Sequence, residues 1–407
     1  MDETPEAPDL SERGGSVTEI FLTFLRLGLT SFGGPIAHLM YFRRELVERG
    51  RWLSEHDYAQ LIGLCQFLPG PASSQAGFAI GLLRGGWPGA LAAFTAFTLP
   101  SALLLFAFAL LLPELGGPLG LAAIHGLKLV ALAVVAHGLL GMSRSLCPDP
   151  PRVAIALVAA GIIVFLGQAW AQLLVVILSA TAGLLVCRDL QPLAQGGFDP
   201  GFGPGPGGLL IGAFALLLIG LPFIADGSSS AIDVFEAFYR AGALVFGGGH
   251  VVLPLLEETV VRPGWIPADD FVAGYGAAQA VPGPMFTLAA YLGAQLPGVQ
   301  GGLGGAAIAL CGIFLPGFLL VAGVLPLWRG IAGRAHAVRA IAGINAAVVG
   351  LLAAALYDPI WISAVRGGPD LVIGLVGFVL LAKWRVSAIV VVLWCVAASV
   401  FVAMALA

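Results

Sequence analysis

The stretch Phe24-Leu-Arg26-Leu-Gly28-Leu-Thr-Ser-Phe32-Gly33-Gly34-Pro35 recurs 214 positions later as Phe238-Tyr-Arg240-Ala-Gly242-Ala-Leu-Val-Phe246-Gly247-Gly248-Gly249. Each copy places one arginine inside an apolar segment and ends that segment at a glycine pair. A second phrase follows each copy: Gln66-Phe-Leu-Pro69-Gly70-Pro71 matches Gln279-Ala-Val-Pro282-Gly283-Pro284, now 213 positions apart. The repetition predicts a duplicated chain, and its interrupted segments are where we expect function.

The composition indicates a membrane protein. Of 407 residues, 59% are hydrophobic and only 10% are charged, whereas soluble domains have roughly 25% charged residues. Uncharged runs longer than about 18 residues are typical of membrane-spanning helices. Such runs cover Gly85–Pro113, Val153–Cys187, Leu209–Ala225, Gly298–Leu327 and Val386–Ala407. We therefore predict an all-α polytopic membrane protein.

Two apolar segments are interrupted by proline and glycine. Inside a helix, glycine costs about 1 kcal/mol and proline about 3 kcal/mol relative to alanine. Leu61–Leu83 and Phe271–Leu296 should therefore break at their Pro-Gly-Pro phrases, which leaves halves too short to span alone. The expected structural helix breaks are Pro69, Pro71, Pro282 and Pro284. These segments, and those that end at the glycine pairs, are predicted to enter the membrane and return to the same side.

The predicted division of the chain follows the duplication. Residues 1–16 are expected to form a disordered tail, 17–187 the first repeat, 188–230 a Gly/Pro-rich linker with one connecting helix, and 231–407 the second repeat. If the interrupted segments are re-entrant, each repeat crosses the membrane four times. The single connecting helix, Leu209–Ala225, then inverts the second repeat.

Charge in the loops agrees with this topology. Cytoplasmic loops are enriched in Lys and Arg. With the N-terminus inside, 14 of the 19 Lys and Arg residues lie inside, three lie in the membrane, and only Arg262 and Arg366 lie outside. The loop after Gly34 is basic and its counterpart after Gly249 is acidic, as inversion requires.

Inverted repeats with interrupted helices are typical of secondary transporters, whose sites lie near the midplane where the repeats meet. Helix N-termini beyond the breaks favour an anion there, and the cations Arg26, Arg240 and Lys128 agree. Alternatively, an arginine pairs with its own acid: Glu236 precedes Arg240 by four residues, whereas Glu19 precedes Arg26 by seven. The expected substrate-binding residues are Arg26, Arg240, Gly33, Gly34, Gly247, Gly248, Gln66, Gln279, Gly70, Gly283, Lys128 and Asn345.

Other polar residues receive a structural interpretation. Ser73, Ser74 and Thr287 follow the breaks, where helix–helix hydrogen bonds are favoured. The histidines His38, His125, His137 and His250 are not repeated in register. The spans contain no aspartate pair, HExxH motif or Ser–Lys dyad, which argues against an intramembrane enzyme. No catalytic residue, metal, cofactor or nucleic acid partner is expected.

The paired Arg-x-Gly-x-x-x-Phe-Gly-Gly and Pro-Gly-Pro phrases resemble the chromate ion transporter family in its full-length, duplicated form. The resemblance extends from about Thr18 to the C-terminus. It implies a multi-pass protein of a bacterial cytoplasmic membrane that exports chromate and gives chromate resistance, with sulfate as a related anion. One departure is Pro35-Ile36 in the first copy against Gly249-His250 in the second, so the two halves have diverged.

Three alternatives stay open from the residues alone: a sulfate or other oxyanion importer, an exchanger, and an anion channel built on the same breaks. The sequence contains no nucleotide-binding motif, so energy is expected from an ion gradient or the membrane potential. It leaves open the direction of transport, the coupling ion and whether a homodimer forms in the bilayer.

Overall fold

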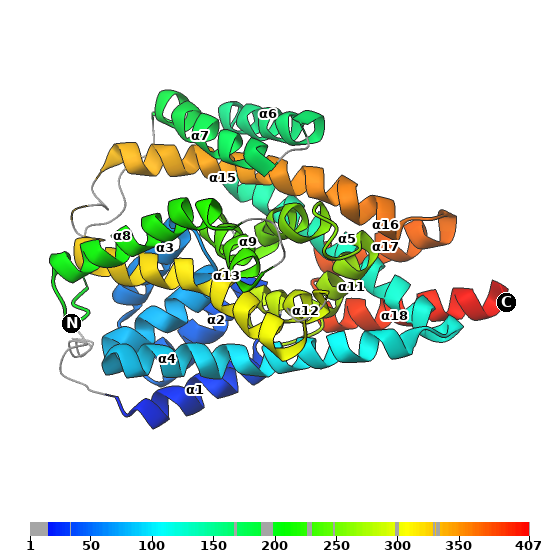
Figure 1. Ribbon diagram of the computed structural model, residues 1–407, viewed down its shortest axis with the longest axis horizontal. Coiled ribbons are helices and arrows are strands. Elements are labelled where there is room, and N and C mark those ends of the chain that lie inside the picture. The colour runs from blue at the N-terminus through cyan, green and yellow to red at the C-terminus, as the bar shows by residue number, and fades with distance from the viewer. Residues whose placement is uncertain are drawn as a thin grey trace, which may run out of the picture.

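The computed structural model describes residues 15–32, 34–166, 169–188, 198–225, 230–246, 249–297, 301–328, 330 and 334–406. Within these ranges every regular element is a helix and none is a strand. The all-α prediction is therefore confirmed. Helix α18 lies at one end of the long axis of the molecule, while α1 and α8 lie toward the other end (Figure 1).

The first repeat contains seven α-helices and shorter helical turns. Their bounds are α1 Val17–Thr30, α2 Gly34–Phe42, η2 Arg43–Arg49, α3 Glu55–Phe67, α4 Ala72–Leu111, η3 Leu112–Leu115, α5 Pro118–Leu146, α6 Pro150–Leu166 and α7 Ala169–Val186. The linking segment carries α8 Pro204–Gly220 and η4 Leu221–Phe223.

From its first helix up to its long helices, the second repeat has the same order of elements as the first repeat. Its bounds are α9 Ala231–Ala243, η5 Gly249–Val251, α10 Val252–Leu256, η6 Glu257–Val261, α11 Ala268–Ala278, η7 Met285–Thr287, α12 Leu288–Gln295, α13 Gly302–Val324, η9 Leu325–Leu327, α15 Ala335–Ala355, η10 Leu356–Trp361, α16 Ile362–Ala364, α17 Gly368–Ala382 and α18 Ala388–Leu406. Each Pro-Gly-Pro phrase falls between two helices, as the sequence predicts.

The long helix α4 is two helices joined at a sharp bend. Gly85 and Gly86 leave helical geometry, with φ of −139° and 61°, and 72–84 turns back against the following part. A β-carbon on Gly81 would stand 2.4 Å from the carbonyl oxygen of Gly89. The second repeat does the same with α12 and α13, where a β-carbon on Gly293 would stand 2.3 Å from a backbone oxygen. A half-helix therefore folds back before the long helix in both repeats.

The apolar helices match the expected crossings. In the described part of the chain, six helices are long and apolar enough to cross a membrane, and three more apolar helices are shorter. They occupy the positions of the nine predicted crossings. The orientation of the repeats relative to a membrane stays a prediction. In Figure 1, α6 and α7 lie outside α15, and α4 runs along the opposite side of the molecule.

The two repeats pack through an aromatic contact between their long helices. Phe78 on α4 stacks on Phe318 of α13, with ring centroids 4.4 Å apart and an interplanar angle of 10°. Phe94 and Phe314 extend the contact at 5.1 Å. Pairs of this kind contribute about 0.5–1.5 kcal/mol each beyond the area that they bury. The breaks are thus held inside a packed core.

Candidate functional site

The breaks of the two repeats are joined by a reciprocal pair of hydrogen bonds. The N–H of Gly70 donates to the carbonyl oxygen of Val245 at 2.7 Å, and the N–H of Gly283 donates to that of Ser31 at 2.9 Å. Gly283 is 213 positions after Gly70, and Val245 is 214 positions after Ser31. Each Pro-Gly-Pro break is therefore bonded to the glycine-pair break of the other repeat.

Both donor glycines adopt a conformation that side chains disfavour. Their φ angles are +124° at Gly70 and +104° at Gly283, in the region that L-residues other than glycine rarely occupy. A β-carbon would also stand 3.1 Å from Gly317 Cα at the first position and 2.8 Å from Ser101 Oγ at the second. Both neighbours directly follow a proline within the long helix of the other repeat.

Gln75 adds a side-chain connection at the same place. It is fully buried, and its amide nitrogen donates to Pro69 O at 2.9 Å and to Gly317 O at 3.1 Å. One side chain therefore satisfies a carbonyl of the first-repeat break and a carbonyl of the second-repeat helix α13. Irregular backbone inside a membrane protein requires that its polar groups be hydrogen-bonded within the protein in this way.

Five buried polar side chains belong to the elements around the first-repeat breaks, namely the end of α1, α2 and α4. We call them the first-repeat polar cluster: Ser31, His38, Ser73, Ser74 and Thr98. Each is at most 4% exposed. His38 Nδ1 and Ser73 Oγ are 3.4 Å apart, the imidazole lies beside the backbone of Ser31, and its ring meets the edge of Phe97 at 5.5 Å. Sequence reasoning gave His38, Ser73 and Ser74 a structural role and did not single out Ser31 or Thr98.

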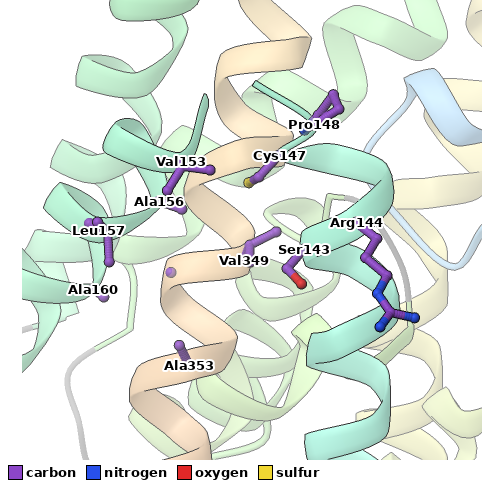
Figure 2. Close-up of a pocket in the computed structure, with 11 residues that line it drawn as sticks. Ser143, Arg144, Cys147, Pro148, Val153, Ala156, Leu157, Ala160, Val349 and Ala353 are labelled. Atoms are coloured by element: carbon purple, nitrogen blue, oxygen red, sulfur yellow. The ribbon is translucent and has the colours of Figure 1, made fainter. Parts of the chain in front are cut away.

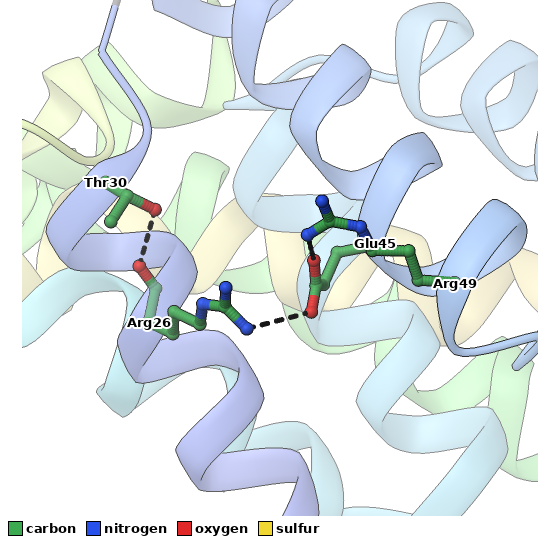
Figure 3. Close-up of polar contacts among 4 residues, drawn as sticks. All are labelled: Arg26, Thr30, Glu45 and Arg49. Atoms are coloured by element: carbon green, nitrogen blue, oxygen red, sulfur yellow. Dashed lines mark hydrogen bonds and ion pairs between the residues drawn. The ribbon is translucent and has the colours of Figure 1, made fainter.

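Arg26 is paired with a glutamate that the sequence did not suggest. Its guanidinium lies 3.4 Å from Glu45 Oε1, and Glu45 Oε2 also contacts Arg49 at 3.0 Å (Figure 3). The Arg26 side chain is 66% exposed. The expected partner, Glu19, instead contacts Arg84 at 3.3 Å.

Arg240 keeps the partner that its spacing suggests. Its Nε lies 3.0 Å from Glu236, four residues earlier, and its side chain is 31% exposed. Nearby, Glu258 contacts Arg262 at 2.8 Å.

The glutamate–arginine pairs occupy equivalent positions in the two repeats. Glu258 and Arg262 stand 213 positions after Glu45 and Arg49, and both glutamates lie in π-helical segments, η2 and η6. The spacing Glu-x-x-x-Arg, followed in the two repeats by Trp52 and Trp265, was the sequence signal that could have identified these pairs.

The remaining predicted residues divide into buried and exposed groups. Lys128, on α5, is 3% exposed and pairs with Asp269 at 2.6 Å. Asn345 lies on α15, which packs against α5. Gln279 is 9% exposed, whereas Gln66 is exposed, so these two repeated amides do not share an environment.

Three predicted glycines, Gly33, Gly247 and Gly248, lie outside the described residues. Gly34 is described, with a φ of +80° at the start of α2. The structure therefore tests the backbone of one of the four glycines in the glycine-pair breaks.

One surface pocket lies away from the breaks. It has a volume of about 590 Å³ between α5, α6 and α15, and its lining is mostly apolar (Figure 2). Arg144 and Ser143 are its main polar residues. Among the residues that the structure describes, no group of three or more His, Cys, Asp or Glu side chains could hold a metal ion. The central breaks are the better candidate for an anion site.

Comparison with known proteins agrees with the sequence resemblance. The profile of the family described as chromate transporter matches residues 18–184 and again 232–400. The chain is 27% identical to a chromate transport protein of Pseudomonas aeruginosa over 93% of this chain and 90% of that protein. It is 28% identical to a chromate transport protein of Cupriavidus metallidurans, over 87% of this chain and 86% of that protein.

A third relative, a probable chromate transport protein of Synechococcus elongatus, is 25% identical over 91% of both chains. No solved structure matches the chain. The arrangement of the breaks described above therefore comes from this structure alone.

Proposed function

We propose that this protein, which belongs to the chromate transporter family, exports chromate from the cytoplasm by alternating access and so gives chromate resistance. The names of its relatives support chromate as the substrate. Sulfate, which has the same charge and a similar shape, is the related anion that the site should also admit. We place the protein in the cytoplasmic membrane of a bacterium, as a multi-pass carrier.

The observation that carries this proposal is the crossed pair of hydrogen bonds, Gly70 to Val245 and Gly283 to Ser31. Inverted-repeat carriers bind their substrate near the midplane, where interrupted helices of both repeats meet. Each of the two bonds brings an interrupted segment of one repeat against an interrupted segment of the other. Movement of one repeat against the other would change this contact, which is what alternating access needs.

The chemistry of the breaks suits an oxyanion. The helix that begins at Ala72 and the turn that begins at Met285 direct N–H groups and positive dipole ends toward the breaks, and such termini bind anions. Neutral donors can hold a dianion that must later be released. The N–H groups of Gly70 and Gly283 are already bonded across the repeats, so we propose that they shape the site and that the N–H groups of the first helical turn hold the anion. We place the amide of Gln279 on the pathway to this site.

The cations have a pathway role in this proposal. Arg26 and Arg240 are each paired with a glutamate and partly exposed, so they can attract the anion and lower the cost of its charge on the way to the breaks. We also place the buried Lys128 and the uncharged Asn345, from the adjacent helices α5 and α15, along this pathway.

Energy for export would come from the membrane potential or an ion gradient. Expelling an anion from a negative interior gains roughly 2.3 kcal/mol per charge per 100 mV. We propose that the repeats 17–187 and 231–407 have opposite orientations in the membrane and that residues 188–230 join them. A homodimer is an additional proposal that the transport mechanism does not require.

Flux in proteoliposomes tests the function. Purified protein is reconstituted, and uptake of radiolabelled chromate is measured with the membrane potential clamped, with and without unlabelled chromate on the opposite side. We expect saturable flux that unlabelled chromate on the far side accelerates. Flux without this acceleration would indicate a channel, and no flux above empty vesicles would reject the proposal. Faster flux of sulfate than of chromate would change the substrate.

A further inference from the structure

The first-repeat polar cluster has no counterpart in the second repeat. The sequences Thr98-Leu-Pro100 and Phe314-Leu-Pro316 align the long helices, so Phe314 stands where Thr98 stands. The other equivalents of the cluster are Val245, Val252, Phe286 and Thr287. Four of the five positions are thus apolar in the second repeat. A fold with these same elements does not need polar side chains at these positions.

Polar atoms of this cluster remain unpaired despite their burial. Among the described residues, no hydrogen-bond partner is found for Ser31 Oγ, His38 Nε2, Ser74 Oγ or Thr98 Oγ1. Buried polar groups are nearly always hydrogen-bonded, and an unpaired one destabilises the fold. By contrast, Thr287, the one hydroxyl at an equivalent position, donates to Pro284 O at 2.6 Å. At the positions equivalent to the cluster, the described second repeat leaves no side-chain group unpaired, although Gln279 Nε2 beside its own break has no partner. Unpaired hydroxyl and imidazole groups at these positions are therefore a feature of the first repeat.

Part of this unused hydrogen-bonding capacity lies at the start of helix α4. Ser73 and Ser74 belong to the first turn of α4, which begins at Ala72, and the first N–H groups of a helix have no partner within it. Hydroxyl, imidazole and backbone N–H groups are all donors, and the cluster contains no carboxylate. A small ligand with acceptor oxygens on every side matches this set. Helix N-termini also favour negative charge.

We propose that the transported oxyanion binds in the first repeat only, at the N-terminus of α4, with the hydroxyls of Ser31, Ser74 and Thr98 and the imidazole N–H of His38 as its donors. The site lies to one side of the pseudo-symmetric crossing of the breaks. Ser73 positions His38 through their contact. The equivalent place in the second repeat is filled by Val245, Phe286 and Phe314 and binds no anion. This inference rests on the proposed function and adds residues to it.

The test compares hydroxyl removal in the two repeats. Thr98→Val keeps the shape of the side chain and removes its hydroxyl, and Ser31→Val can be compared with Ser31→Thr, which differs from it by the hydroxyl alone. Thr287→Val is the matched control in the second repeat. Binding of radiolabelled chromate to the purified full-length protein gives Kd, and thermal unfolding without anion gives Tm.

We expect opposite effects in the two repeats. Thr98→Val and Ser31→Val should each raise Kd on the order of 10-fold or more, because each loses a hydrogen bond to a charged ligand. Their Tm without anion should stay equal or rise, because an unpaired hydroxyl has been removed. Ser31→Thr should restore binding. Thr287→Val should lower Tm and leave Kd unchanged.

Unchanged Kd in both valine variants of the first repeat would overturn the inference, and so would an equal loss of binding in Thr287→Val. These results differ from failure of the proposed function, in which the wild-type protein binds or moves no chromate. A wild-type protein that binds sulfate instead, and loses it in Thr98→Val, would support the cluster and overturn chromate as the substrate.

Discussion

The N–H of Gly70 donates a 2.7 Å hydrogen bond to the carbonyl oxygen of Val245, 175 residues later in the chain. This bond and its repeat-equivalent, from Gly283 to Ser31, join the four interrupted segments in two pairs across the repeats. Neither bond involves a side chain. The contact therefore depends on backbone geometry that only glycine adopts readily at the two donor positions.

Substitution of these glycines should abolish transport. Gly70→Ala and Gly283→Ala each place a β-carbon at a positive φ, which costs roughly 1–2 kcal/mol, and against the long helix of the other repeat. We expect less than a tenth of wild-type chromate flux in proteoliposomes, with lower thermal stability. Gly63→Ala is the control, because a β-carbon there meets no atom within 4 Å. Wild-type flux in both break variants would show that the crossing is not needed.

Replacement of the paired arginines should lower chromate flux, and for the exposed Arg26 it should do so with little change in thermal stability. Exposed ion pairs contribute about 0–1 kcal/mol, so Arg26→Ala should change Tm little. If Arg26 guides the anion, chromate flux should nevertheless fall about 10-fold or more, the equivalent of roughly 1.4 kcal/mol. Arg240→Ala should lower flux as well, with a larger fall in Tm, because it leaves the mostly buried Glu236 without its partner. Arg152→Ala, which breaks a comparable pair with Asp149, serves as the control. Near-normal flux in both variants at normal expression would remove the arginines from the pathway.

The Lys128–Asp269 pair should respond unequally to loss of either partner. Lys128 is buried, and the Asp269 side chain is 59% exposed. Asp269→Asn removes the ion-pair partner of the buried Lys128 and leaves only the nearby Asp270 to offset its charge, so it should destabilise the protein by up to about 3–5 kcal/mol. Lys128→Met leaves a solvated carboxylate and should destabilise the protein less. Thermal unfolding of the two single variants and the double variant measures this. Equal destabilisation by Asp269→Asn and Lys128→Met would contradict the assignment of Lys128 as the buried partner.

Glu257 predicts a pH dependence of stability. It lies in η6, outside the apolar spans, and burial raises its pKa to about 7, with Arg262 opposing the shift. The folded state therefore binds the proton more tightly than the unfolded state does. The resulting stability is present at low pH and is lost as pH rises through about 7, by up to about 1.4 kcal/mol per pH unit. Glu257→Gln should flatten this part of the Tm–pH curve, and Glu48→Gln, at an exposed site, should not. A Tm–pH curve of Glu257→Gln that runs parallel to the wild-type curve would contradict the prediction.

The interrupted helices could be predicted from the sequence because their cause is local. Proline and glycine at positions 69–71 and 282–284 break a helix wherever they occur, and α3, α4, α11 and η7 end or begin beside them. The bend at Gly85 and Gly86 also follows from adjacent residues.

The partners across these breaks could not be predicted, because they depend on three-dimensional packing. Nothing near Arg26 in the sequence indicates Glu45, which reaches it only when the next helix folds back. The first-repeat polar cluster was missed for a different reason. Internal repetition was the criterion for function, and Ser31, His38 and Thr98 are the positions where the repeats differ.

The central claim is that the two repeats have opposite orientations, so that their breaks cross in the middle. Sided labelling tests it most directly. Single cysteines at Arg44→Cys and Pro263→Cys, both exposed and both between the two breaks of their own repeat, are placed in a protein whose five native cysteines are replaced and whose flux is retained. The account predicts that a membrane-impermeant maleimide labels Pro263→Cys in intact cells and Arg44→Cys only after permeabilisation. Labelling of both positions from the same side would contradict it.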